Sequence, residues 1–359
     1  MKISDIQSEL IKIGGRTTEC REPLSLIWTG SYVEFCVKAS EFQILIEGPY
    51  CTYENWIAIE VNGAVLSRRM VSCEKEWVTV FRMMNPDKPT KVRIIKEVQA
   101  FADDDQHRLN IYEIKTDGEL LPVTDGKLKI EFVGDSINSA EGCAGAVCEE
   151  EWIAQFFSHV HSYPYMVGKL LNADINVISQ SGYGAYASWD CNVNNAVPNF
   201  YEEVCSVMQG EYFKQNGFHD KWDFGIWQPD VVVINLGTND DFAFRNEDCP
   251  GSSVLVLEGD TYRESDRLKV RDAMVRFLKV VRKNNPAAMI YWAFGMLGND
   301  MKATILEAMN IVCKELNDDK IRFIQLPNTS EEEIGARSHP GVVAHKKVAD
   351  IIAGVIEAR

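Results

Sequence analysis

From about residue 126 to its C-terminus, the chain has a repeating pattern that few folds can satisfy. Short runs of apolar, mostly β-branched residues alternate there with longer stretches of helical period. The runs predict five strands, at residues 129–133, 176–179, 230–236, 289–293 and 321–325. Because these strands are apolar throughout and helices lie between most of them, they favour a parallel five-stranded sheet covered by helices on both faces.

Helical periodicity is clear in three places of this region. Apolar residues recur there at intervals of three and four, which puts them on one face of each helix. The first such set is Val270, Met274, Phe277, Leu278 and Val281. Residues 305–316 and 348–355 repeat the spacing. In open parallel sheets with such helices, binding and catalytic groups gather at the carboxyl ends of the strands.

The N-terminal part of the chain has a different pattern. Aromatic and β-branched segments, separated by turn signals such as Asn62-Gly63, fill residues 24–122. The segments predict strands at residues 32–37, 42–46, 56–61, 77–82 and 108–115. Their length and spacing are typical of an all-β sandwich or jelly roll. We therefore expect a β-sandwich domain at residues 1–125 and an α/β domain at residues 126–359.

The composition excludes some partners. The 359 residues include 37 Lys and Arg against 53 Asp and Glu, so the formal net charge is −16. Nucleic acids and anionic membranes bind basic surfaces, so neither partner is expected. No apolar run approaches the roughly 18 residues that cross a bilayer. A homo-oligomer is left open, with the sandwich as a surface for subunit contacts.

The N-terminus and the cysteines bear on location. Asp5 and Glu9 interrupt the segment in which a secretory signal would have its apolar core. The ten cysteines are scattered and form no C-x-x-C pair. We expect reduced, mostly buried cysteines in a cytoplasmic protein, with a secreted protein whose signal was removed as the alternative.

Four polar segments follow predicted strands or precede the last predicted helix. They read GDS after the first strand, SGYG after the second, GTND after the third and SHPG before the helix. Each alone has an ordinary structural explanation, such as a helix cap, a flexible loop, an Asx turn or an exposed histidine. Three of them lie at strand ends, and together the four predict one site.

These segments contain a minimal set of groups for acyl transfer. Ser136 supplies a nucleophilic hydroxyl, and a helix after it would add its dipole. His339 supplies a base. The backbone N–H of Gly182 can approach a substrate oxygen closely, and the side-chain amide of Asn239 can donate to an oxyanion.

The segments FVGDS, SQSGYG, GTND and SHPG resemble the four blocks of the SGNH (GDSL-type) hydrolases, with Ser136, Gly182, Asn239 and His339 at the positions that name the family. A β-sandwich joined to such a domain resembles carbohydrate esterase family 2, and WTGSYVEF at residues 28–35 is similar to the start of that family's sandwich. The resemblance implies a serine esterase that removes acetyl groups from polysaccharides such as xylan without a cofactor. Its substrate would be an acetylated polysaccharide or oligosaccharide.

The chain departs from the SGNH pattern at Ala336, where these enzymes usually have an Asp three residues before the histidine. We therefore expect a Ser136–His339 dyad, as in some members of carbohydrate esterase family 2. A backbone carbonyl that accepts the Nδ1–H would hold the imidazole tautomer. The resemblance also implies an oxyanion hole made by the backbone N–H groups of Ser136 and Gly182 and by the Asn239 side chain.

Other residues near the four segments have less specific roles. Tyr183 and Trp189 lie in or just after the second segment, where they would either stack on a sugar or pack in the core. Trp292 is open to the same two interpretations. Asp135 is expected to have a local structural role, and Asp240 to support its loop.

Two further features remain. His159 and His161, which flank Val160, have no matching set of ligands elsewhere in the sequence, so we expect no metal. The acid-rich residues 241–266 follow the Asn239 segment and would form a lid or a subunit contact.

Two alternative functions stay open. One is a broader esterase for short acyl chains; a lipase is disfavoured because the 241–266 stretch is acidic rather than apolar. The other is a carbohydrate-binding protein with a weakened hydrolase site, because the usual Asp is replaced by Ala336.

Overall fold

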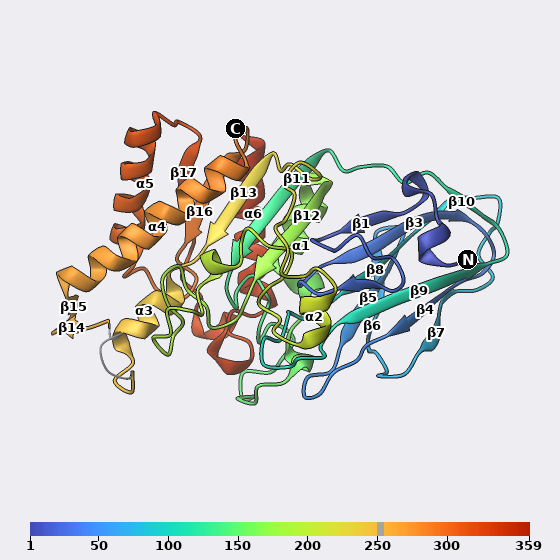
Figure 1. The fold of residues 1–359 in the computed structure, drawn as a ribbon, viewed down its shortest axis with the longest axis horizontal. Helices are drawn as coiled ribbons and strands as arrows, with labels where there is room; N and C mark the ends of the chain where they lie inside the picture. The colour runs from blue at the N-terminus through green and yellow to red at the C-terminus, as the bar shows by residue number, and fades with distance from the viewer. Residues whose placement is uncertain (250–254) are drawn as a thin grey trace. The chain divides into compact units, whose positions relative to one another are not determined.

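The computed structural model describes residues 1–249 and 255–359, and its contacts divide them into two compact units (Figure 1). The first unit comprises Met1–Gly126, Glu151–Val160 and Glu203–Trp222. The second unit comprises Lys127–Glu150, His161–Glu202 and Asp223–Arg359.

Two segments of the first unit come from beyond residue 126, the part of the sequence assigned to the α/β domain. Aromatic contacts explain their place. The Trp28 indole donates a 2.7 Å hydrogen bond to the Val204 carbonyl, and the Phe101 and Phe157 rings lie 5.4 Å apart. Neither segment contains a strand, so the strand pattern gave no sign of this exchange.

The first unit contains two antiparallel sheets, which confirms the predicted all-β sandwich. One sheet has the order β1 (Lys12–Gly14), β3 (Tyr32–Lys38), β8 (Thr90–Lys96), β5 (Trp56–Val61) and β6 (Ala64–Met70), with β10 (Glu119–Leu121) on β3. The other has the order β2 (Leu24–Leu26), β9 (Leu109–Thr116), β4 (Phe42–Glu47) and β7 (Glu76–Phe81). Buried aliphatic and aromatic side chains from both sheets form its core. The short helix α2 (Glu211–Gln215) belongs to this unit.

The second unit is built on the predicted parallel sheet of five strands. Its order is β12 (Ala173–Ser179), β11 (Leu128–Gly134), β13 (Val231–Asn235), β16 (Met289–Phe294) and β17 (Ile321–Gln325). Gly134, at the end of β11, is level with Ser179 on one side and Asn235 on the other. The carboxyl ends of three strands therefore meet at one edge.

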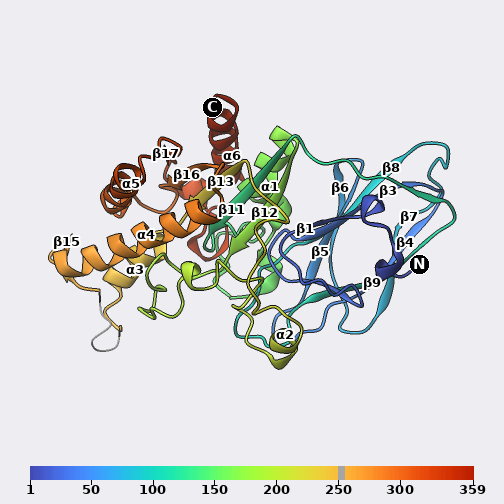
Figure 2. The ribbon, with the colours of Figure 1, turned by 45° about the horizontal axis from the view of Figure 1, so that its top comes forward.

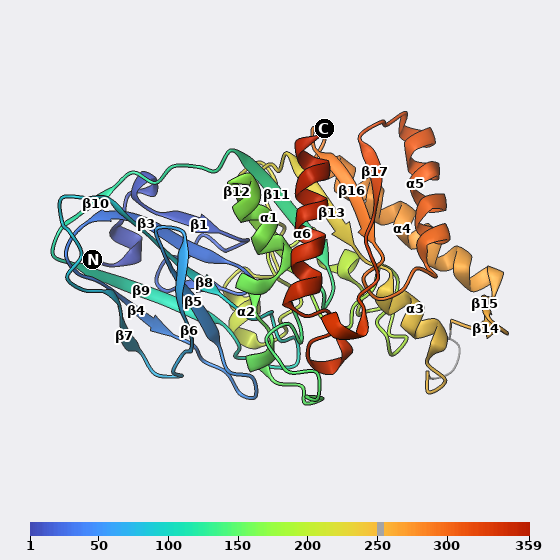
Figure 3. The same ribbon diagram turned by 180° about the vertical axis from the view of Figure 1, so that it is seen from behind.

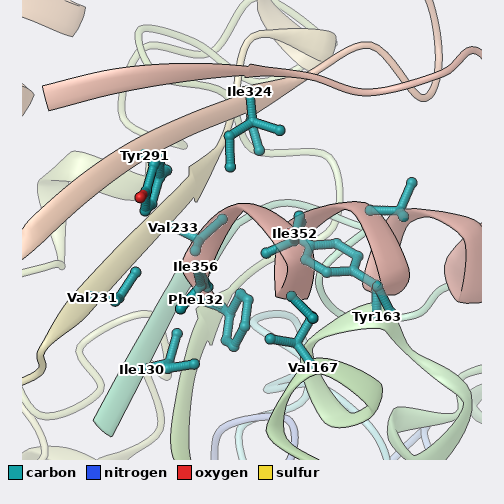
Figure 4. Packing of buried hydrophobic residues seen from close by; sticks show 14 of the residues in the cluster. Ile130, Phe132, Tyr163, Val167, Val231, Val233, Tyr291, Ile324, Ile352 and Ile356 are labelled. Atoms are coloured by element: carbon teal, nitrogen blue, oxygen red, sulfur yellow. The ribbon is translucent and has the colours of Figure 1, made fainter. Parts of the chain in front are cut away.

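Helices cover both faces of this sheet. Helices α1 (Tyr163–Leu171) and α6 (Val342–Glu357) lie on one face, in front of the strands in Figure 3. Their apolar side chains pack on the sheet in a fully buried core (Figure 4). Helix α4 (Glu264–Asn284) lies on the opposite face, beside α5 (Lys302–Leu316), as Figures 1 and 2 show. Helix α3 (Thr238–Arg245) follows β13 directly.

The stretch expected to be a lid or subunit contact, residues 241–266, holds the end of α3, the two-residue strands β14 (Leu257–Glu258) and β15 (Thr261–Tyr262), and the start of α4. Residues 250–254 of this stretch lie outside the described residues. Across the described part of the chain, every helix is too short or too polar to cross a membrane.

The prediction of reduced, mostly buried cysteines is wrong. Cys191 and Cys249 form a disulfide with a Cα–Cα distance of 5.8 Å. Four other cysteines have exposed side chains: Cys20, Cys51, Cys73 and Cys148. The bonded pair is 58 residues apart in sequence, and only the folding of the loop after β12 toward the end of α3 brings the two together.

Candidate active site

The four predicted segments meet at the carboxyl edge of the parallel sheet. Ser136 follows β11, Gly182 follows β12, and Asn239 lies in the first turn of α3 after β13. His339 lies in the loop that leads into α6. Hydrogen bonds between these segments hold the four blocks together in one cluster.

Ser136 and His339 form a hydrogen-bonded pair. The Oγ of Ser136 lies 2.9 Å from the Nε2 of His339. Ser136 is 5% exposed and the His339 side chain 18%, so both are sheltered but open to a ligand. This is the geometry of a nucleophile and its general base.

The helix expected after Ser136 is absent from the described residues that follow it. Successive turns occupy residues 136–144 instead, with Ser139 N–H donating to the Asp135 carbonyl and Glu141 N–H to the Ser136 carbonyl. A helix dipole therefore does not act on the serine. The turns return the chain toward the histidine loop, which a helix would not do.

The Arg337 carbonyl orients the imidazole. It lies 2.7 Å from the Nδ1 of His339, so Nδ1 carries the proton and Nε2 is left as the acceptor for the serine hydroxyl. Arg337 has a left-handed backbone conformation, with φ 55° and ψ 36°, which turns its carbonyl toward the ring. Ala336, where SGNH enzymes usually have an Asp, is fully buried.

Gly142 joins the serine segment to the histidine loop. Its carbonyl accepts the Ala336 N–H at 2.9 Å, and its φ is +71°. A Cβ atom at this position would overlap the Ala336 carbonyl oxygen and lie 3.0 Å from the Cβ of His339. Only glycine therefore permits this approach of the two segments.

Gly182 lies in the loop after β12, and Asn239 lies in the first turn of α3. Gly182 has a φ of +81°. The Nδ2 atom of Asn239 donates to the Tyr183 carbonyl at 3.1 Å and to the Asp135 carboxyl at 3.3 Å. These bonds fix the amide of Asn239 next to both the serine segment and the glycine segment.

Two buried acids support the site. The Asp240 carboxyl accepts the N–H groups of Ala185, Tyr186 and Ala187 at 2.7, 2.8 and 3.2 Å, which holds the loop after Gly182. Burial raises the pKa of Asp240 to about 6 and that of Asp135 to about 7. Asp135 also accepts the Ile137 N–H at 3.0 Å. Both therefore have the supporting contacts expected from the sequence.

The three aromatic candidates for sugar binding differ in their exposure to solvent. Trp189 is 54% exposed, and its backbone N–H donates to the Gly182 carbonyl at 3.0 Å. Its indole lies against the Cα of Gly182, since a Cβ there would be 3.0 Å from the ring. Tyr183 is half-buried, at the same loop. Trp292 is fully buried and donates to the Leu236 carbonyl at 3.0 Å, so it belongs to the core.

Glu141 and Arg337 were not singled out in the sequence. The Oε2 of Glu141 lies 3.5 Å from the Nε2 of His339, and its Oε1 accepts a 3.0 Å hydrogen bond from the Arg337 Nε. Both residues are close in sequence to the motif residues Ser136 and His339. Their closeness in sequence to these motifs is a usable signal, but the SGNH pattern points only to an acid beside the histidine.

A second cluster of ligand-type side chains occurs in the first unit. Within residues 1–249 and 255–359, Cys51, Asp104 and Asp105 are the one group of three whose ligand atoms lie within 4.8 Å of one another. The Asp104 carboxyl already accepts the N–H groups of Cys51, Thr52 and Tyr53. These bonds explain the cluster as the closure of a loop.

Comparison with known proteins identifies the family. No family model matches the chain. The structure of an acetyl xylan esterase from the rumen bacterium Butyrivibrio proteoclasticus matches all of this chain and 98% of its own, with 37% identity and a TM-score of 0.96. A family two carbohydrate esterase from Clostridium thermocellum, solved with cellohexaose, covers 97% of this chain and 98% of its own at 24% identity and a TM-score of 0.79. The chain belongs to carbohydrate esterase family 2.

Membership of carbohydrate esterase family 2 confirms the resemblance, the two-part fold and the activity class: the chain is a carbohydrate esterase. Among curated relatives, the cellulase/esterase CelE of Acetivibrio thermocellus is 26% identical over 352 residues. That match covers 92% of this chain but 37% of the relative, so the chain spans little more than a third of that protein. An acetylxylan esterase/glucomannan deacetylase of Cellvibrio japonicus is 23% identical over 286 residues, 73% of this chain and 72% of its own.

Proposed function

We propose that this family 2 esterase removes O-acetyl groups from xylan-type polysaccharides or oligosaccharides through an acyl-enzyme on Ser136, with His339 as the base. The observation that carries the proposal is the 2.9 Å contact between Ser136 Oγ and His339 Nε2, with Nδ1 bonded to a carbonyl. The names of the Butyrivibrio and Cellvibrio relatives support the acetylated xylan substrate.

In the first half of the reaction, Ser136 Oγ attacks the acetyl carbonyl carbon and its proton moves to His339 Nε2. The electron pair of the carbonyl moves to its oxygen. The N–H groups of Ser136 and Gly182 and the Asn239 amide are the donors for this oxyanion. His339 then gives its proton to the sugar oxygen as the carbon–oxygen bond breaks, which leaves acetyl on Ser136.

In the second half, water attacks the acetyl-enzyme. His339 takes a proton from the water as the new bond to carbon forms, and the oxyanion is held by the same donors. Collapse of this intermediate releases acetate, and His339 returns the proton to Ser136 Oγ. The Arg337 carbonyl keeps Nε2 available for each of these transfers.

Trp189 is the candidate for sugar binding. Its exposed indole lies against Gly182, so a sugar ring stacked on it would place an acetyl group near the oxyanion donors. The cellohexaose complex of the Clostridium relative shows that a protein of this fold binds a glycan chain. Tyr183, on the same loop, is the second candidate.

The location of the protein determines which form of substrate it meets. The expected cytoplasmic location and the Cys191–Cys249 disulfide are in conflict, because the cytosol keeps thiols reduced. A cytoplasmic enzyme would act on imported oligosaccharides with this pair reduced, whereas an exported enzyme would reach the polymer with the bond formed. Cell fractionation with thiol labelling of the two cysteines distinguishes these cases.

The decisive experiment measures acetate release from acetylated xylan by the wild type and by Ser136→Ala. We expect a loss of at least about 10³-fold in kcat with an unchanged Tm. Retained acetate release would refute the role of Ser136. Faster hydrolysis of aryl acetates than of acetylated xylan would favour the broader esterase, and xylan affinity without turnover in the wild type would favour a binding protein.

A further inference from the structure

A buried carboxylate faces the atom of His339 that receives the serine proton. Glu141 is 3% exposed, and its Oε2 lies 3.5 Å from Nε2. The carboxylate of a serine hydrolase triad lies on the other side of the ring, at Nδ1. Here that side is taken by the Arg337 carbonyl, so the acid approaches the imidazole from the opposite direction.

Arg337 holds this carboxylate in place. Its Nε donates to Glu141 Oε1 at 3.0 Å, while its Nη1 donates to the Glu150 carbonyl at 2.7 Å. Its backbone N–H donates to the Glu149 carbonyl at 2.8 Å. One residue thus orients the imidazole with its carbonyl and anchors Glu141 with its guanidinium.

We propose that Glu141 is a positioning residue that takes over the electrostatic role of the carboxylate missing at position 336: it stabilises the imidazolium formed at His339 from the Nε2 side, while Arg337 fixes it there. The proposal rests on the proposed function of Ser136 and His339. Two roles that one Asp combines in a triad are divided here. The tautomer depends on a main-chain oxygen, and the charge depends on Glu141.

Glu141 is suited to stabilise charge rather than to take the proton. A carboxylate that is paired with a guanidinium is a much weaker base than imidazole. A negative charge this close to Nε2 favours the protonated ring, and it does so most when the serine proton has moved there. The interaction is therefore stronger in the transition state than in the free enzyme, as a contribution to rate requires.

Other ionisable groups around the ring are common to all the variants below. Asp135 precedes Ser136 in the chain, and His345 on α6 and His161 interact electrostatically with each other. His345 interacts in the same way with His339, and burial lowers its pKa to about 3, so it stays neutral. Glu141 also contributes to the raised pKa of Asp135, which is about 7, so titration of the His339 ring itself by NMR is needed to separate its response from that of Asp135.

The test uses Glu141→Gln, which keeps the shape of the side chain and removes its charge. The acidic limb of the kcat/KM profile should move to lower pH by about one unit, and kcat/KM at the optimum should fall about tenfold. Glu150→Gln is the matched control, with the same charge change on an exposed side chain nearby, and should leave the limb unchanged. In a Ser136→Ala background, NMR titration of the His339 ring should show the same lowering of its pKa.

Arg337→Gln should shift the acidic limb of the kcat/KM profile in the opposite direction. It provides the test if the Glu141→Gln variant does not fold. Removal of the guanidinium leaves Glu141 with its full charge beside the ring, so the limb should move to higher pH. A limb that stays fixed in Glu141→Gln, or that stays fixed or falls in Arg337→Gln, overturns the proposal. Ser136→Ala tests the esterase mechanism separately from the role of Glu141. If Ser136→Ala is inactive and the acidic limbs of the Glu141 and Arg337 variants do not move, the mechanism stands and only the role of Glu141 fails.

Discussion

Four buried acids, two in each unit, have different kinds of partner. In the sandwich, Glu34 is paired with Arg93 and Glu97 with Arg68, at 2.9 Å for the latter pair. In the α/β unit, Asp135 and Asp240 accept hydrogen bonds from backbone N–H groups, and Asp135 also accepts one from the Asn239 amide. Burial raises the pKa of Glu97 against the opposing effect of Arg68, and burial among neutral donors raises the pKa values of Asp135 and Asp240 to about 7 and 6.

The contrast indicates a division of labour. Charges in the sandwich are paired in a way that supports stability, and polar groups at the strand ends of the α/β unit are arranged for chemistry. Substitutions in the two places should then affect different observables. The following predictions test this division.

The largest effect is expected for Asn239→Ala. Loss of one oxyanion donor typically lowers kcat by about 10²–10³-fold. We expect this loss in acetate release. Because the truncation also removes one donor from the buried Asp135 carboxyl, the free energy of unfolding should fall by about 1–3 kcal/mol. An Asn239→Ala variant that loses stability but keeps its kcat would contradict a catalytic role for the polar groups at the strand ends.

Arg68→Met should lower stability with little change in kcat. It leaves Glu97 buried without its guanidinium, which should lower the free energy of unfolding by about 3 kcal/mol. The kcat of the folded protein for an aryl acetate should stay within about twofold. The control is Arg82→Met, which removes an exposed ion pair with Glu41 and should cost less than about 1 kcal/mol.

Asp135→Asn should change how stability depends on pH. Burial raises the pKa of the folded-state carboxyl to about 7, above its ordinary value near 4, so the folded state holds this proton more tightly than the unfolded state. The stability it contributes is complete below about pH 4 and is lost as the pH rises through about 7. Between pH 5 and pH 8 the wild type should lose about 2–3 kcal/mol more than Asp135→Asn in denaturant titrations. Parallel curves for the two proteins would contradict the raised pKa.

The smallest effect is expected for the double variant Cys191→Ser and Cys249→Ser. The disulfide and the Asn246 amide, which donates to the Trp189 carbonyl at 3.2 Å, both tie the loop of Trp189 to the end of α3. Loosening this loop should raise the KM for acetylated xylo-oligosaccharides about threefold, because the loop would then lose conformational entropy when the sugar binds. The kcat for an aryl acetate, which needs no sugar contact, should not change.

Much of the fold could be predicted from the sequence because buried elements have clear patterns. Apolar side chains predominate in the strands of the parallel sheet, although β11, β12 and β17 include charged ones, and four of the five strands were located to within two residues at both ends. In the sandwich, five strands were missed: the three-residue strands β1, β2 and β10, and the longer strands β6 and β8. β6 is an edge strand with mostly exposed side chains, and β8 interleaves Lys and Arg with apolar residues, so neither has a continuous apolar run.

The candidate site was predictable in part for a related reason. Ser136, Gly182, Asn239 and His339 are each next to a strand end or a helix start, so a local pattern identified them. Contacts over long sequence distances leave no such pattern. Glu141 and Arg337 are 196 residues apart, and neither their pairing nor the Cys191–Cys249 bond could be read from spacing.

The use of a main-chain oxygen to orient the base has an evolutionary consequence. Side chains at positions 336 and 337 can be exchanged without deleting that acceptor, since every residue carries a carbonyl. The vulnerable property is instead the left-handed bend at Arg337, which β-branched residues disfavour and proline forbids. Replacing the side chain at 337 should therefore leave the tautomer in place even where it removes the anchor of Glu141, and an acid restored at 336 would be redundant for holding the tautomer.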